Sequence, residues 1–150
     1  MRIAVGFDHG GITLRDTVIQ CLRELAHEIT DFGISEEESV DYPDYARRVA
    51  EAVAGGECER GVLVCGTGIG MSISANKVTG CYAALVADAY SAAMAAQHNA
   101  ANVICLGGRT IGPEVARLIL RTYLAAEADP AERHQNRRDK ICRIERHELW

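Results

Sequence analysis

A cysteine at the end of an apolar run is the residue of this sequence best placed to do chemistry. The run from Val62 to Cys65 is continuous and contains β-branched side chains, which predicts a buried strand. Gly66, Gly68 and Gly70 follow it. Because glycine has no Cβ, the backbone N–H groups of such a turn can point toward a bound anion. We therefore expect the Cys65 thiol to lie beside a cradle of amide dipoles at the carboxyl end of a strand.

The chain has six cysteines, and Cys65 has the strongest claim to reactivity. Their spacing includes no CxxC pair and no zinc-finger pattern, which suits the reduced thiols of a cytoplasmic protein. Oriented N–H groups and helix N-termini favour the ionised form of a thiol, so the turn after Cys65 favours a reactive thiolate there. The alternative is a small buried hydrophobic residue, which is what most free cysteines are.

Three further side chains could move protons near this thiol. Thr67 offers a hydroxyl within the turn, although turn threonines commonly bond local backbone instead. His9 follows the first predicted strand and His98 ends an alanine-rich predicted helix, and we expect both at the ligand-binding edge. An acid–base role and a structural role for these histidines are equally supported. Their spacing does not suit a metal site, so no metal is expected.

Two arginines near the C-terminus favour an anionic ligand. Arg133 and Arg137 are one helical turn apart, and the same stripe continues to Ile141 and Ile144. We therefore expect these guanidinium groups to point toward protein, where they need an anion, and arginine's fork fits phosphate. Arg109, just after the fifth predicted strand, is a third candidate. The alternative is a solvated helix with ion pairs along its own surface.

Five strands alternating with helices predict an α/β fold, a three-layer α/β/α arrangement around a parallel sheet, in one domain spanning residues 1–150. The strands are expected at 2–7, 27–32, 61–65, 82–87 and 103–106, and the helices at 12–25, 43–54, 71–77, 89–98, 113–122 and from Asp129 toward Leu149. Asp129, Pro130 and Glu132 match the capping box of the last helix. Ligands of such folds bind at the carboxyl ends of the strands.

Several other functions are disfavoured by the sequence. The turn after Gly68 departs from GxGxxG, because Met71 stands where the last glycine belongs, and no GKS or GKT follows. No nucleotide cofactor is therefore expected. The net charge of −5 argues against nucleic acid as the main partner, since such binding requires a basic face. No apolar run is long enough for a membrane span, and no signal peptide precedes the first predicted strand.

With these residues assembled, the whole chain resembles the type B ribose-5-phosphate isomerases, which share a superfamily with galactose-6-phosphate isomerase subunits. Five motifs carry the resemblance: DHGG at Asp8 to Gly11, DYPDYA at Asp41 to Ala46, CGTGIGMSISANK at Cys65 to Lys77, QHN at Gln97 to Asn99 and RHQNR at Arg133 to Arg137. The resemblance implies a Rossmann-like fold and a cofactor-independent aldose–ketose isomerase that works through a cis-enediolate.

The resemblance also implies roles for single residues. Cys65 matches the base that moves a proton between C1 and C2, Thr67 the hydroxyl that assists it, and His98 the acid that opens the furanose ring. The backbone amides of Gly66, Gly68, Ile69 and Gly70 match the anion hole for the enediolate oxygen. The sugar or phosphate contacts are matched by Asp8, His9, Tyr42, Asn99, Arg109, Arg133 and Arg137.

The implied partners are a sugar phosphate and a second copy of the chain. In this family the site combines residues of two subunits, so we expect a homodimer with the terminal helix packed across it; a dimer of dimers stays open. Ribose 5-phosphate and ribulose 5-phosphate, of the pentose phosphate pathway, are the favoured substrates. Allose 6-phosphate, galactose 6-phosphate or a tetrose phosphate are alternatives, as is a non-catalytic sugar-phosphate sensor.

Overall fold

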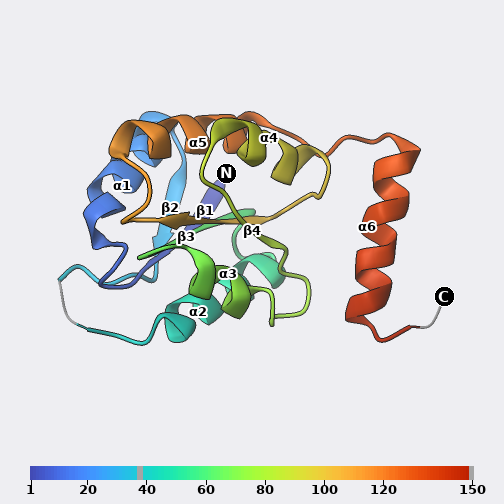
Figure 1. The fold of residues 1–150 in the computed structure, drawn as a ribbon, viewed down its shortest axis with the longest axis horizontal. Helices are drawn as coiled ribbons and strands as arrows, with labels where there is room; N and C mark the ends of the chain where they lie inside the picture. The colour runs from blue at the N-terminus through green and yellow to red at the C-terminus, as the bar shows by residue number, and fades with distance from the viewer. Residues whose placement is uncertain (37–38, 149–150) are drawn as a thin grey trace.

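The computed structural model describes residues 1–36 and 39–148 (Figure 1). In chain order the elements are β1 (Arg2–Phe7), the 3₁₀ turn η1 (Ile12–Leu14), α1 (Arg15–Glu24), β2 (Glu28–Asp31), α2 (Tyr42–Ala54), β3 (Arg60–Cys65), α3 (Ile69–Ala75), β4 (Ala83–Leu85), α4 (Ala89–Gln97), β5 (Val103–Gly107), α5 (Pro113–Ala125) and α6 (Glu132–Glu145). Among these elements, no helix combines the length and apolar content that a membrane crossing requires.

The five strands form one parallel sheet in the order β2-β1-β3-β5-β4. Helices α1, α4 and α5 cover one face, and α2 and α3 cover the other (Figure 1). Successive residues of β3 alternate between these two layers, so Val62 and Val64 join one core while Leu63 and Cys65 join the other. Burial on both faces explains the continuous apolar run, and the predicted three-layer α/β/α fold is confirmed.

The topology places a switch point between β1 and β3. After β1 the chain moves outward to β2, and it returns to the other side of β1 as β3. Loops that leave two adjacent strands in opposite directions open a crevice at the carboxyl edge, which is where ligands bind in such sheets. Cys65 ends β3 at this crevice, and Asp8 and His9 follow β1 beside it. The fold therefore brings these residues to one edge, as predicted.

Three predicted helix ends were wrong. Helix α3 begins at Ile69, two residues before the expected start, because Gly68 in the left-handed conformation already turns the chain into the helix. The N-cap of α6 is Ala131, and the Asp129 carboxylate instead accepts the Ala131 N–H (2.8 Å), so the predicted capping box does not form. Helix α6 ends at Glu145; Leu149, toward which it was predicted to run, lies outside the described residues.

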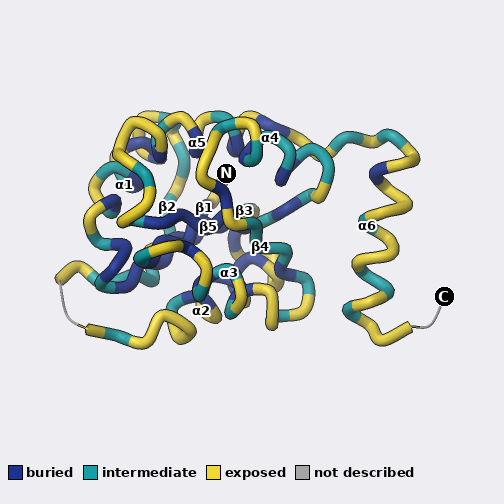
Figure 2. Tube along the Cα trace, viewed as in Figure 1, coloured by how far each residue is buried: buried dark blue, intermediate teal, exposed yellow. Residues whose placement is uncertain are grey.

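Helix α6 stands beside the main body and is exposed along most of its length (Figures 1 and 2). His134 is its one buried residue within the described part. Arg133 and Arg137, which were predicted to point toward protein, are exposed within this chain, and Ile144, farther along that stripe, is 59% exposed. The face of α6 that meets the body is the adjacent stripe, which starts one residue after Arg133. It carries His134, Arg138 and Cys142.

The buried hydroxyl of Tyr123 provides a test of the core. It donates to the carbonyl of Ala101 (2.9 Å), and the ring is fully buried in the layer of α1, α4 and α5. Because Tyr123→Phe leaves that carbonyl without its donor, we expect the free energy of unfolding to fall by about 1–2 kcal/mol in urea titration. Tyr90→Phe is the matched control, since Tyr90 is 75% exposed; equal effects of the two changes would contradict this assignment.

Candidate active site

The carboxyl end of β3 holds the Cys65 sulfur against a backbone donor. The side chain is 5% exposed, and its Sγ accepts a hydrogen bond from the N–H of Gly68 (3.1 Å). Gly68 has a φ of 79°, a conformation that disfavours any residue with a Cβ. This turn points the amide back at the sulfur, and a donor so placed stabilises negative charge there.

The loop after β5 closes over this turn. The N–H of Gly108 donates to the Cys65 carbonyl (2.8 Å), and the N–H of Arg109 donates to the Gly66 carbonyl (3.0 Å). The Arg109 side chain then lies over Gly66, because a Cβ added there would stand 3.5 Å from Arg109 Nη1. The guanidinium group therefore lies beside the backbone next to Cys65, which makes the edge attractive to an anion.

The loop after β1 forms the opposite wall. The Asp8 carboxylate is buried, and its Oδ1 accepts the N–H groups of Gly10 (2.8 Å) and Gly11 (2.9 Å). This carboxylate therefore shapes the loop. The N–H of Val40 donates to His9 Nδ1 (3.3 Å), which leaves Nε2 as the protonated nitrogen when the ring is neutral.

Two other predicted residues lie at this edge. The Tyr42 ring packs against Gly70, where an added Cβ would stand 2.6 Å from ring carbon Cε2. The Thr67 hydroxyl accepts from the N–H of Ile69 at 3.4 Å, a long hydrogen bond that leaves it able to bond elsewhere. The structure thus brings Asp8, His9, Tyr42, the Cys65 to Gly70 turn and Arg109 together.

Three other thiols, Cys58, Cys81 and Cys105, share the core layer with Cys65, and burial perturbs two of them. Cys105 and Cys81 are buried in the same cluster. Burial raises the pKa of Cys105 well above its usual range and that of Cys81 to about 12. Both therefore stay protonated at neutral pH, and neither lies at a strand end beside a turn amide. Cys65, by contrast, lies at a strand end and accepts a hydrogen bond from a turn amide.

His98 does not lie at this edge, so the prediction that it joins Cys65 within one chain was wrong. Helix α4 starts after β4 at the carboxyl edge and runs antiparallel to the strands, so its C-terminal residue is carried to the amino edge. Because strands rise about 3.3 Å per residue, the five residues of β5 alone separate the two edges by roughly 15 Å. Asn99 follows His98 at the amino edge, and α6 places Arg133 there too.

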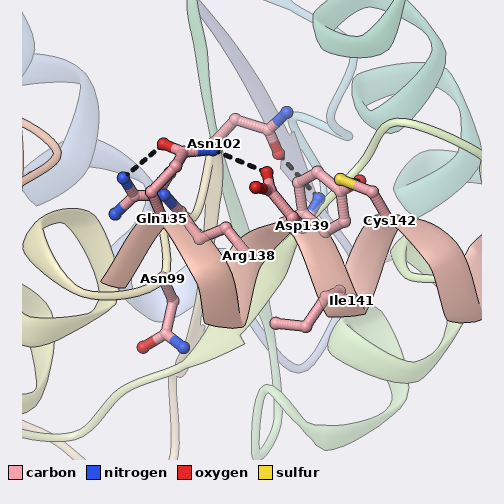
Figure 3. A pocket seen from close by; sticks show the side chains of 9 residues that line it. Asn99, Asn102, Gln135, Arg138, Asp139, Ile141 and Cys142 are labelled. Carbon is pink, nitrogen blue, oxygen red and sulfur yellow. Dashed lines mark hydrogen bonds between the residues drawn. The ribbon is translucent and has the colours of Figure 1, made fainter. Parts of the chain in front are cut away.

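The amino edge carries a second polar cluster, built by the end of α4 and by α6. The Arg138 guanidinium donates to the carbonyls of Gln97 (3.5 Å), His98 (3.4 Å) and Asp129 (3.0 Å). Cationic donors suit the free carbonyls at a helix C-terminus. Between α6 and the body lies a hollow of about 300 Å³, lined by Asn99, Asn102 and α6 side chains including Arg138 (Figure 3).

Sequence reasoning missed two residues of this second cluster. His134 stacks on His98, with ring centroids 4.1 Å apart and planes 13° apart, and Arg138 anchors the backbone beside it. These residues are four apart on α6, one helical turn, and each follows one of the predicted phosphate arginines directly. The spacing was therefore visible in the sequence, but it did not show which of the two adjacent stripes faces the body.

The carboxyl-edge crevice, with a thiol, an oriented N–H and an arginine, has the groups expected of an anion-binding site in an α/β enzyme. A family model described as Ribose/Galactose Isomerase matches residues 3–141. The chain belongs to this family of aldose–ketose isomerases.

Curated relatives match over most of their length. Ribose-5-phosphate isomerase B of Escherichia coli (strain K12) is 44% identical over 144 residues, which cover 96% of this chain and 96% of that protein. D-erythrulose-4-phosphate isomerase of Pectobacterium atrosepticum is 44% identical over 128 residues, which cover 85% of this chain and 84% of that protein.

Solved structures share the fold. Ribose-5-phosphate isomerase B of Clostridium thermocellum superposes with a TM-score of 0.95 at 46% identity, covering 98% of this chain and 99% of that one. The Mycoplasma genitalium enzyme, solved with bound ribulose 5-phosphate, superposes with a TM-score of 0.91 at 38% identity, covering 97% and 96%.

Substitution of Gly68 tests the turn that holds the sulfur. In Gly68→Ala the left-handed backbone is strained, and the new Cβ would stand 2.5 Å from Leu85 Cδ1 and 3.0 Å from the Leu106 carbonyl carbon. Gly56→Ala carries the same backbone strain at a φ of 76° with nothing within 4 Å. We expect Gly56→Ala to lower the free energy of unfolding by about 1–2 kcal/mol, and Gly68→Ala to lower it by roughly 1–3 kcal/mol more. Equal losses in denaturant titration would show that the turn has room for a Cβ.

Proposed function

We propose that this protein interconverts ribose 5-phosphate and ribulose 5-phosphate. The observation that carries the proposal is the Cys65 sulfur, held by the Gly68 N–H at the switch point with Arg109 over the same turn. A base, an oriented amide and a guanidinium group are what an isomerisation of a phosphorylated sugar needs. The relatives named for this reaction, one of them solved with ribulose 5-phosphate, support the same choice.

The reaction begins by opening the sugar ring. His98 donates a proton to the ring oxygen, the bond between that oxygen and C1 breaks with its electrons on oxygen, and the C1 hydroxyl loses its proton as the C1 carbonyl forms. The proton needed by the ring oxygen is thus balanced by the one that leaves the C1 hydroxyl. Histidine suits this step because it holds or releases a proton near neutral pH.

The second stage moves a proton between two carbons. The Cys65 thiolate removes the proton from C2, and the electrons pass into a C1–C2 double bond while the carbonyl oxygen becomes an oxyanion. The backbone amides from Gly66 to Gly70 stabilise this cis-enediolate, and loss of one such donor costs about 10²- to 10³-fold in rate. Thr67 moves the hydroxyl proton from O2 toward O1, and Cys65 returns its proton to C1, which yields the ketose.

One chain holds the two halves of this site at opposite edges of the sheet, so a second copy must bring them together. Arg133 and Arg137 are exposed and free to reach a phosphate bound to another subunit. Apolar side chains are exposed on the edge strand β4 (Leu85) and on α3 (Ile69 and Ile73), which suits burial against a partner. The proposed active unit is a homodimer in which α6 crosses to the partner, with His98, Asn99, Arg133 and Arg137 serving the partner's Cys65 crevice.

A tetrose phosphate is the second candidate substrate, because one relative is named for D-erythrulose 4-phosphate. A four-carbon aldose phosphorylated on its last oxygen cannot close a five-membered ring, so it needs no ring-opening acid. His98, with its own packed support on α6, therefore favours the pentose phosphate.

Removal of the Cys65 sulfur tests the proposed base. We expect Cys65→Ala to lower kcat for ribose 5-phosphate by at least about 10²-fold, because no other group takes the C2 proton, while KM changes little. The measurement is a coupled assay of ribulose 5-phosphate formation. Cys58→Ala is the matched control, since Cys58 is a buried thiol of the same core cluster before β3, and it should keep the wild-type kcat. Wild type that binds the sugar phosphate without turnover would instead identify a sensor.

Mixed dimers test whether the site is shared between subunits. We expect coexpressed Cys65→Ala and His98→Asn chains to regain about a quarter of wild-type turnover of ribose 5-phosphate, because half of the dimers are mixed and each carries one intact site. Each variant expressed alone is the control. Activity of the mixture equal to the mean of the two separate variants would show that Cys65 and His98 act within one chain.

A further inference from the structure

Two residues of α6 contact His98, in addition to the backbone hydrogen bond within its own helix. His134 and Arg138 lie one turn apart on the face of α6 that meets the end of α4. Arg138 holds the carbonyl of His98, and the His134 ring lies flat against the His98 ring. One residue therefore fixes the backbone of His98 and the other fixes its imidazole.

The surroundings of position 134 are unusual for a histidine whose only role is to fill space. It is 2% exposed, its Nε2 accepts from Arg133 Nε (3.2 Å) and lies 3.5 Å from Asp129 Oδ2, and its Nδ1 has no hydrogen-bond partner within residues 1–36 and 39–148. Burying a polar ring atom without a partner is unfavourable. A leucine or phenylalanine would fill the position without that cost, so packing alone does not account for an imidazole here.

The surroundings of His134 favour its neutral form. Burial, then the neighbouring His98, then Arg133 lower the pKa of His134, with Arg137 acting in the same direction and the Asp129 carboxylate opposing them. His134 is therefore neutral at physiological pH. The half-buried His98 ring, 4.1 Å away and nearly parallel, therefore packs against a flat, uncharged surface.

We propose that His134 is a positioning residue for the isomerase: its buried ring is the platform against which the His98 ring stacks, and this stacking holds His98 in the orientation that delivers a proton to the ring oxygen of the sugar. The inference rests on the proposed function, because it requires His98 to open the ring. It adds a residue that touches neither the sugar nor the phosphate and acts through His98 alone.

The effect of the platform is specific to ring-closed substrates. A misplaced His98 slows ring opening but does not slow proton transfer by Cys65 once the aldehyde is free. Ribose 5-phosphate is mostly ring-closed, and erythrose 4-phosphate cannot form a five-membered ring. The ratio of kcat values for these two substrates therefore isolates the step that His98 performs, whereas a general loss of folding or assembly lowers both values together.

The test measures this ratio for wild type, His98→Asn, His134→Ala and His134→Phe, with Lys140→Ala as the control on the exposed side of α6. We expect His134→Ala to lower the ratio about tenfold, because small displacements of a catalytic group are costly. His134→Phe should restore most of it, since a phenyl ring is also flat, buried and neutral, and Lys140→Ala should leave it unchanged.

Two outcomes overturn the inference while leaving the proposed function intact: His98→Asn lowers the ratio but His134→Ala does not, or His134→Phe lowers it as far as His134→Ala. If His134→Ala does not fold, the comparison of His134→Phe with His134→Asn decides the matter in the same way, because asparagine offers no platform. If His98→Asn leaves the ratio of the two kcat values unchanged, His98 does not open the ring. That result would overturn both the ring-opening role of His98 and the inference about His134.

Discussion

The direction of the strands is the constraint on which the whole structure depends. All five strands run parallel, so every strand ends at one edge and every helix that follows carries the chain back to the other. A residue at a strand end, such as Cys65, therefore cannot meet a residue at the end of helix α4, such as His98, within the same chain. The proposed reaction, which uses both residues, would therefore have to be assembled from two copies of the chain.

Local sequence signals were sufficient to predict the fold and to predict which residues meet at the carboxyl edge of the sheet. The apolar run before Cys65 and the glycines after it determine a buried strand and a tight turn by short-range rules, and the parallel arrangement then brings Asp8, Cys65 and Arg109 to one edge. Each step depends on neighbours in the chain or on the general direction of strands, so each could be predicted without coordinates.

The second cluster could not be predicted in the same way, because its geometry is decided by tertiary contacts. The edge occupied by His98 depends on the direction of α4, which the histidine's residue type does not reveal. Two adjacent stripes of α6 carry basic residues, and the choice between them depends on stacking and on a hydrogen bond to a carbonyl of another helix. The failed capping box has the same origin, since Asp129 is held by a backbone contact to Gln97 and by a local turn.

The way α6 is attached connects the proposed dimer with the proposed activity. Hydrophobic burial is the main stabilising term in folding, yet α6 buries one polar residue against its own chain and is otherwise held by polar contacts of Arg138, Cys142 and Glu145. Hydrogen bonds near the surface contribute little individually, so this helix is held far more weakly than the strands. Within the described residues Ile141 and Ile144 are 38% and 59% exposed, which suits further burial against another molecule. Dimer formation would therefore fix the position of α6 at the same time as it delivers His98 and the two arginines to a substrate, because all of them are attached to the same helix or its contacts.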